Sequence, residues 1–283
     1  MAGAQFVVGH PAPPLRPFVD RYLGYREPAP HPLIRTEVAG AFVVLVLGWG
    51  APLDVVDPRA AERAAYGVDS FVAGPFDAYC TTSTVGVGAG VQLLLAPLAA
   101  RRILGVPLSE LANRAVAVSQ LGDPWLDRLR GRLAEERDWP ARFTLLDAAL
   151  HARLAATGPV DRRLDRAWAR LAGSGGRLGV ATLADELGWS RRHLAARFGQ
   201  EVGLTPKTAG RLLRFQRAYA MLARGPLAGP TAVRAGAADA GWAARAAHLG
   251  YYDQSHLIRD FRRFAGATPA ALGGAGSHSS NTG

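Results

Sequence analysis

The sequence predicts an α+β fold in which a β-rich N-terminal part is followed by an all-α C-terminal part. Two observations support this division. Short apolar runs separated by Gly and Pro fill the first ~95 residues, which is typical of a small antiparallel barrel or sandwich. From Pro97 onward, apolar residues recur at helical spacing instead.

Local patterns place the elements of the N-terminal part. The expected strands are 42–47, 53–56, 71–73, 79–85 and 91–95. A helix follows from Pro97, and Asp123 with Pro124 predicts the start of another, because Asp is a favoured N-cap and Pro a favoured first helical residue. A third helix holds Phe143 and Leu154. Thr157-Gly158-Pro159 then predicts a boundary, which gives domains 1–157 and 160–272 and a disordered tail 273–283.

Length and composition restrict the class of protein. With 283 residues, 49% of them hydrophobic, the chain has enough material for two folded domains. Cys80 is the only cysteine, which excludes an internal disulfide, a cysteine-based zinc site and CxxC redox chemistry. The longest strongly apolar run, 41–47, is far shorter than the roughly 20 residues needed to cross a bilayer, and the N-terminus lacks a signal pattern. We therefore expect a soluble, cytoplasmic protein with no membrane partner.

The net charge lies entirely in the C-terminal part. Residues 1–160 hold 15 Arg and 15 Asp or Glu, whereas residues 161–283 hold 18 Arg or Lys against eight Asp or Glu, so the second part carries the whole net charge of +10. Basic side chains beside phosphates release condensed counterions, so a basic module joined to a neutral one indicates nucleic-acid binding. An Arg-rich surface that is merely solvated is the alternative.

An internal repeat organises the basic part. A shift of 63 residues superposes apolar positions and a G-x-T-P stop: His193 on His256, Leu194 on Leu257, Phe198 on Phe261, Gly203 on Gly266, Thr205 on Thr268 and Pro206 on Pro269. Each copy predicts a short helix ended by Gly188 or Gly250, a tight turn, and a second helix capped by Ser190 or Asp253. Each copy is therefore a helix-turn-helix. The connector helix predicted between them, 207–223, has this apolar face: Leu212, Phe215, Tyr219 and Leu222.

A helix-turn-helix inserts the N-terminal half of its second helix into the major groove of DNA. The residues placed there and not needed for the core are Arg191, Arg192, Ala195 and Ala196 in the first copy, and Gln254, Ser255, His256 and Arg259 in the second. Arg and Gln form bidentate contacts to guanine and adenine, and Ala contacts thymine methyl groups. Two such helices on a rigid connector would read two groove segments about one turn, ~34 Å, apart.

Four other basic residues are candidates for phosphate contact, with a solubilising surface charge as the alternative for each: Arg211, Arg214, Arg262 and Arg263. His193 and His256 occupy the same repeat position beside an N-cap, which indicates either a shared structural role or a shared phosphate contact.

At these residues the sequence resembles the AraC (arabinose-regulator) family of bacterial transcription regulators. The segment GYYDQSHLIRDF at 250–261, continued by Phe264, Gly266, Thr268 and Pro269, is similar to the family signature almost position for position. The resemblance implies a regulator of double-stranded DNA in which the first recognition helix makes the main base contacts and the second adds base or backbone contacts. RNA polymerase and a second copy of the chain are further candidate partners.

The N-terminal part is similar to the cupin-like sensing domain of one subset of this family, with the switch from strands to helices at 97–105. This implies a small-molecule effector or dimerisation. A cupin metal site needs spaced His and Glu, and 32–150 contains no His, so we expect no metal and no cofactor. Trp49, Tyr79 and Trp125 are candidates for an effector pocket, although core positions are more common for such residues.

Two positions depart from the family pattern. Ala196 stands where members often have Arg, whereas the second copy keeps Arg259 at the equivalent place, so the first unit would read bases mainly through Arg191 and Arg192. Arg245 occupies the repeat position of an apolar residue and predicts a stability penalty in the second unit.

We predict a sequence-specific DNA-binding transcription regulator, modulated by an effector through its N-terminal domain and without enzymatic activity. One alternative is a cupin-like enzyme or an alkyl transferase with a DNA-binding appendage, which would need a metal cluster or an activated cysteine. Cys80 has no base or cation among its sequence neighbours, so a partly buried strand thiol is expected there. The other alternative is an architectural protein that binds any nucleic acid.

Overall fold

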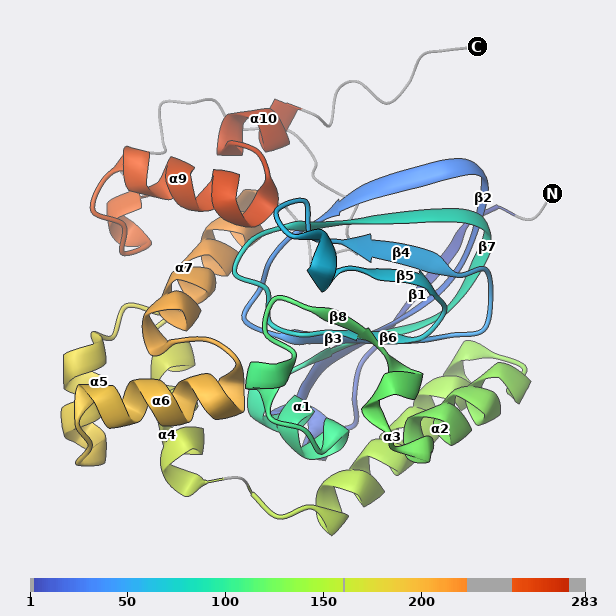
Figure 1. Cartoon of the computed structure of the whole chain (residues 1–283), viewed down its shortest axis with the longest axis horizontal. Helices are drawn as coiled ribbons and strands as arrows, with labels where there is room; N and C mark the ends of the chain where they lie inside the picture. Colours follow the sequence, from blue (N-terminus) through green and yellow to red (C-terminus); the bar gives the residue numbers. More distant parts are fainter. Residues whose placement is uncertain (1–2, 160, 223–245, 275–283) are drawn as a thin grey trace.

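The computed structural model describes residues 3–159, 161–222 and 246–274 of the chain. An antiparallel sheet with covering helices forms the N-terminal part, and the C-terminal helices lie beside the sheet (Figure 1). The predicted α+β class is confirmed, and the described residues include the first helix-turn-helix, the connector helix and the recognition helix of the second unit. Residues 223–245, which include Arg245, lie outside the described residues. So do residues 275–283 of the predicted tail.

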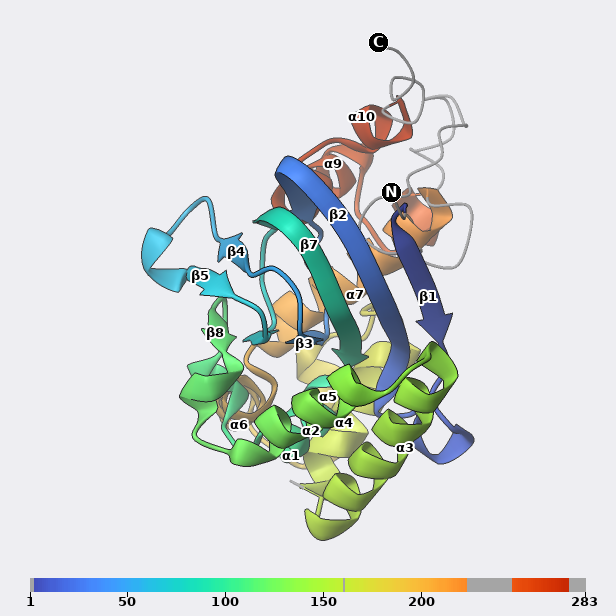
Figure 2. The same ribbon diagram turned by 90° about the vertical axis from the view of Figure 1, so that its right-hand side faces the viewer.

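All strands of the described residues belong to one antiparallel sheet, ordered β1-β2-β7-β3-β6-β8, with β4 paired to β5 and β7. The strands are β1 (Gln5–Gly9), β2 (Val19–Glu37), β3 (Val43–Gly48), β4 (Leu53–Val56), β5 (Ala65–Val68), β6 (Phe71–Ala73), β7 (Cys80–Leu95) and β8 (Ala115–Ala117). Strands β3, β4 and β6 match the prediction within one residue. Figure 2 shows the long β2 and β7 side by side across the sheet.

The two long strands differ from the sequence prediction for identifiable reasons. Two strands were expected where β7 is continuous, because the glycines of 86–90 indicated a break. Gly90 instead allows β7 to approach β3 closely, since a Cβ at this position would lie 2.8 Å from Gly48 Cα. Strand β2 was not predicted, because its three prolines within 28–32 are typical of loops. The sheet accommodates them at a register shift between Ala29 and Leu33.

Three helices cover one face of the sheet: α1 (Pro97–Leu104), α2 (Pro124–Glu135) and α3 (Trp139–Ala156). Asp123 caps α2 as predicted, accepting a hydrogen bond from the Trp125 amide at 2.9 Å. Figures 1 and 2 both place α2 and α3 together against the same end of the sheet. The leucines of these helices form one buried cluster with the strands.

Strand alternation divides the sheet between two cores. In β3, Leu45 and Leu47 point into the cluster with α1–α3, whereas Val46 belongs to a second cluster shared with the C-terminal helices. This second cluster also contains Phe198, Phe215 and other fully buried residues of the C-terminal part. Burying each such side chain stabilises the fold by about 1.5–3 kcal/mol, so the C-terminal helices are integral to the second core.

The C-terminal helices are α4 (Arg162–Gly173), α5 (Val180–Leu187), α6 (Arg191–Val202), α7 (Pro206–Leu222), α9 (Gln254–Ala265) and α10 (Pro269–Gly274). Helix α7 is the predicted connector and packs against α4, α6, α9 and α10. Helix α4 was not predicted, although Asp161 caps it and Leu164, Ala167 and Leu171 form its buried face. Helix α3 ends at Ala156 and α4 begins at Arg162, and the domain division at 157–160 stays a prediction.

Candidate nucleic-acid interface

The first helix-turn-helix consists of α5 and α6. The Ser190 hydroxyl accepts a hydrogen bond from the His193 amide at 3.1 Å and so fixes the start of α6. Leu194 and Phe198 are fully buried, and this anchors the opposite side of α6 in the core. The four residues predicted to face DNA therefore stand at the accessible side of the helix: Arg191, Arg192 and Ala196 are exposed and Ala195 is half-buried.

The second unit repeats this geometry in α9. Asp253 Oδ1 accepts a hydrogen bond from the His256 amide at 2.6 Å, and Leu257 and Phe261 are fully buried. The predicted contact residues of this helix are accessible to different degrees: Ser255, Arg259 and Arg262 are exposed, and Gln254 and His256 are half-buried. Within the described residues, Arg191, Arg192, Arg259 and Arg262 form no ion pair, so their guanidinium groups are free for phosphates or base edges.

The two histidines of the repeat have equivalent aromatic neighbours. The His193 ring lies edge-on to Trp189 with centroids 4.8 Å apart, and the His256 ring lies edge-on to Tyr251 at 5.2 Å. In both units the ring therefore packs against the residue that follows the helix-ending glycine. This geometry favours the structural role, one of the two roles that the sequence indicates.

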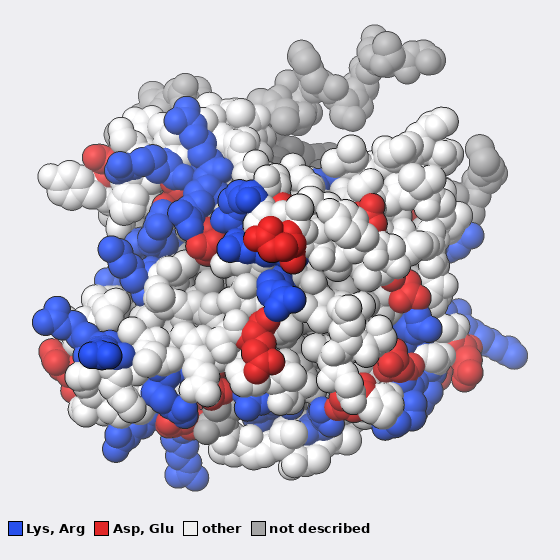
Figure 3. Space-filling view, viewed as in Figure 1, with Lys and Arg blue, Asp and Glu red and all other residues white. Residues whose placement is uncertain are grey.

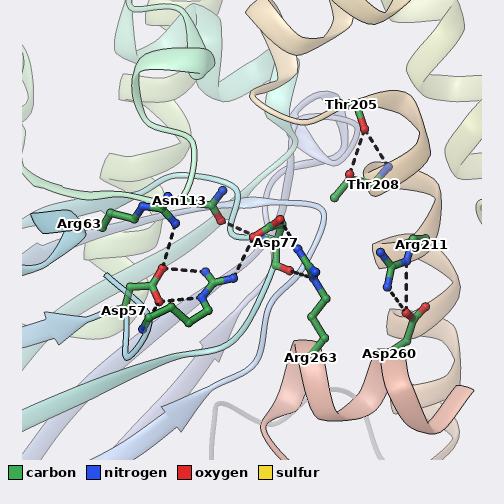
Figure 4. Close-up of polar contacts among 10 residues, drawn as sticks. Asp57, Arg63, Asp77, Asn113, Thr205, Thr208, Arg211, Asp260 and Arg263 are labelled. Carbon is green, nitrogen blue, oxygen red and sulfur yellow. Dashed lines mark hydrogen bonds and ion pairs between the residues drawn. The ribbon is translucent and has the colours of Figure 1, made fainter. Parts of the chain in front are cut away.

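Three of the four other phosphate candidates have partners inside the protein. Arg211 binds Asp260 through Nη2 at 2.5 Å, Arg214 donates to the Gly176 carbonyl, and Arg263 binds Asp77 at 2.5 Å. Figure 4 shows the first and third of these pairs, with Arg211 and Asp260 joining α7 to α9. These arginines hold the helices together, and Arg262 keeps the exposed position expected of a phosphate contact.

Basic side chains crowd the helical side of the face shown in Figure 3, whereas acidic and basic side chains are mixed over the N-terminal part. The exposed arginines of α6 and α9 belong to the part of the chain that carries the whole net charge of +10. The electrostatic potential thus attracts a polyanion toward the same helices that present the candidate base-reading residues.

A cavity of about 490 Å³ separates the inner face of the sheet from α7. Its wall is mostly apolar, and α7 contributes Phe215, Gln216 and Tyr219. Four charged side chains of β2 also line it: Arg21, Glu27, Arg35 and Glu37. The residues named from sequence as pocket candidates, Trp49, Tyr79 and Trp125, are not part of this wall; Trp49 and Trp125 pack against the cluster with α1–α3.

The charged groups of the cavity are partly compensated. Arg35 forms an ion pair with Glu27, and Glu37 accepts a hydrogen bond from the Thr82 hydroxyl at 2.9 Å. Burial raises the pKa of the Glu37 carboxyl above its usual 4.5, although Thr82 and Arg35 oppose the shift. Sequence reasoning missed these residues because β2 was not predicted. All four residues have odd numbers, and alternate residues of a strand share one face of the sheet. This spacing was the signal in the sequence that could have grouped them.

The raised pKa of Glu37 predicts a pH-dependent stability. A carboxyl whose folded pKa lies above its unfolded value favours folding only when protonated, so its contribution falls as pH rises above about 4.5. Glu37→Gln should therefore raise the melting temperature at neutral pH, and this gain should disappear toward pH 4.5. Thermal unfolding followed by circular dichroism across this range checks it. The exposed carboxylate variant Glu135→Gln serves as the control; an equal gain from both would contradict the prediction.

Cys80 also lines the cavity and is 7% exposed. Burial raises the pKa of its thiol to about 12, with further contributions from Glu37 and Asp57, so the thiolate is scarce at neutral pH. The expectation of a strand thiol agrees with this environment. A buried thiol with a raised pKa is a weak nucleophile at neutral pH.

Comparison with known proteins supports the helix-turn-helix prediction. Residues 183–273 match a protein-family model described as "Helix-turn-helix domain". No curated protein matches the chain. No helix in the described part is long and apolar enough to cross a membrane.

Solved structures with a similar arrangement include ToxT from Vibrio cholerae, with 10% sequence identity over 95% of this chain and 97% of that one and a TM-score of 0.46. Unsaturated fatty acid-bound wild-type ToxT from Vibrio cholerae has 11% identity over 96% of each chain and a TM-score of 0.45. The AraC-like transcriptional activator CuxR has 16% identity over 77% of this chain and 87% of that one, with a TM-score of 0.26. These similarities are too low to transfer a residue or a ligand.

The two capped recognition helices, the exposed arginines on them and the helix-turn-helix match define a DNA-binding transcription regulator. The signature at 250–269 is the more specific feature, because it combines the capped helix, its buried face and the G-x-T-P stop. Residues 183–273 match the helix-turn-helix model, and within them the segment 250–269 resembles the signature of the AraC family of transcription regulators.

Proposed function

We propose that this protein binds specific double-stranded DNA sites through α6 and α9, and that a small apolar molecule in the cavity modulates this binding. The observation that carries the first part is the equivalence of the two units. Each presents an N-terminal helical half with free arginines while its opposite side is buried in one continuous core. A single chain thereby offers two reading helices with a defined relation to each other.

Selection of bound sites from random DNA with the full-length protein tests the first part. We expect a site with two half-sites about one helical turn apart, bound at least ~10³-fold more tightly than random DNA at the same salt concentration. An architectural protein would instead bind both DNAs with similar affinity, and that outcome would overturn the proposal. The predicted contacts with RNA polymerase and a second copy of the chain are separate proposals, which this selection does not address.

The cavity carries the second part of the proposal. Its volume of about 490 Å³ falls within the ~300–1,000 Å³ typical of ligand sites, and its wall combines apolar residues with a few polar groups. Because β2 and β7 form one side and α7 the other, an occupant would contact both the sheet and the connector of the two reading units.

Titration calorimetry with n-decanol, an apolar probe with one hydroxyl group, tests this part. We expect binding by the full chain and its loss in Val46→Phe, which fills the cavity from β3. Ile34→Phe is the matched control, because Ile34 is 69% exposed and lies outside the cavity wall. Equal binding by both variants would place the probe elsewhere and contradict the effector role.

A further inference from the structure

The segment that joins β6 to β7, residues 74–79, has two differently engaged sides. Gly74, Phe76 and Ala78 line the cavity. Pro75, Asp77 and Tyr79 are not part of the cavity wall and contact other groups, so they form the outer side of the segment. The cavity wall and the outer surface of this segment are therefore separated by a single backbone.

The outer side contacts the first helix-turn-helix at the end of its recognition helix. Gly203, the left-handed residue after α6, packs so closely that a Cβ there would lie 2.8 Å from Pro75 Cγ and 2.7 Å from the Leu108 carbonyl oxygen. Arg101 of α1 adds an ion pair to the buried Glu201 at 2.9 Å. The C-terminal end of α6 is thus seated on the N-terminal part.

The same side contacts the second unit at the equivalent repeat position. Gly266, 63 residues after Gly203, packs against the ring of Tyr79, with a Cβ there at 3.3 Å from ring carbon Cε1. The Tyr79 amide donates to the Arg263 carbonyl at 3.1 Å, and the Ala39 amide donates to the next carbonyl, of Phe264, at 2.8 Å. The last carbonyls of a helix have no partner within it, so the N-terminal part supplies the missing donors of α9.

Asp77 completes this contact and is held from both sides. Arg263 donates through Nε to the Asp77 carbonyl at 2.8 Å and through Nη2 to its carboxylate at 2.5 Å. On the N-terminal side, Arg59 donates to the same carboxylate at 3.1 Å, and the Asp77 amide donates to Asn113 Oδ1 at 2.8 Å. Figure 4 shows Asp77 between Asn113 and Arg263 of α9.

We propose that segment 74–79 is a positioning element that fixes the separation of the two recognition helices and transmits the occupancy of the cavity to both of them. The transmission rests on the effector role proposed above, whereas the positioning does not. Because both recognition helices meet this segment at the same repeat position, a displacement of its inner side would move their ends relative to each other. Asp77 acts as a positioning residue through Arg263, without a place in the reading surface.

Distances between spin labels on the two recognition helices test the proposal in the full chain. Labels at Gln200→Cys and Arg259→Cys, both at exposed positions, in a Cys80→Ser background report the separation of α6 and α9. We expect a narrow distance distribution for the parent and a broader, displaced one for Asp77→Ala. Asp77→Asn, which keeps the shape of the side chain, should give an intermediate result if the alanine variant folds poorly. Asp69→Ala is the matched control, because it removes the Asp69–Arg130 ion pair within the N-terminal part.

A parent-like distribution in both Asp77 variants would overturn the positioning role. Saturating n-decanol should displace the distribution of the parent but not that of Asp77→Ala; binding without displacement would overturn the transmission. If n-decanol did not bind at all, the effector role would fail together with the transmission that rests on it, and the Asp77 variants would still decide the positioning role. Site selection with unlabelled Asp77→Ala should show a loss of preference for one half-site spacing.

Discussion

Arg192→Ala should weaken binding to the selected DNA site by about 1–3 kcal/mol, with a much smaller effect on random DNA. Arg192 lies in the first turn of α6, is exposed, and points away from the side anchored by Leu194 and Phe198. Arg259→Ala should have an effect of the same kind in the second unit, because Arg259 is exposed in the N-terminal half of α9, at the repeat position of Ala196. Fluorescence anisotropy with the selected duplex and a scrambled duplex, at several salt concentrations, measures the specific and the non-specific binding free energies.

Arg262→Ala is the matched control for these variants. Arg262 is exposed but lies beyond the core residue Phe261, in the last turn of α9, where phosphates are the expected contact. Arg262→Ala should weaken binding to all sequences alike. It should also reduce the slope of the logarithm of the binding constant against the logarithm of salt concentration by about one. If Arg192→Ala and Arg262→Ala lowered specific and random binding equally, Arg192 would be a phosphate contact.

Arg211→Ala should destabilise the folded protein by about 2–4 kcal/mol, because it leaves a buried carboxylate without its counter-charge. The Asp260 side chain is fully buried, and its Oδ2 already has no hydrogen-bond partner among the described residues. Arg211 is itself 28% exposed, so the loss should fall in the lower part of the range for buried pairs. Urea unfolding monitored by circular dichroism measures the change in free energy.

The double variant Arg211→Met with Asp260→Leu separates the charge effect from packing. Removing both charges restores an apolar contact between α7 and α9 and should recover most of the lost stability. A double variant as unstable as Arg211→Ala would show instead that shape, and not the unpaired charge, dominates. Arg217→Ala, on an exposed position of the same helix, should have little effect on unfolding.

The helix-turn-helix units could be predicted in detail because their determinants are local. Ser190 and Asp253 cap helices through amides three residues ahead, and Gly203 and Gly266 end them in the left-handed conformation. Such rules depend on neighbours in the sequence alone. The contact residues of α6 and α9 could therefore be placed on the accessible side before any tertiary contact was known, although their roles at DNA stay predictions.

The cavity and the outer contacts of 74–79 depend on long-range packing, and local patterns did not predict them. Arg263 and Asp77 are separated by 186 residues, so no spacing rule relates them. Glu37 belongs to a strand whose prolines are typical of loops, and only its pairing with β7 establishes its face. Arg263 was accordingly predicted to contact phosphate, whereas the structure pairs it with Asp77.

The shared core constrains how this architecture can recombine during evolution. The inner face of the sheet, including Val46 and Phe71, is completed by residues of the C-terminal helices such as Phe215. A gene fusion that exchanged the C-terminal half for that of a distant relative would leave this face mismatched in shape. An exchange that keeps the core intact therefore has to retain the apolar side of α7 together with the sheet. The segment that is inherited as a unit is accordingly longer than the recognition helices and includes the connector helix.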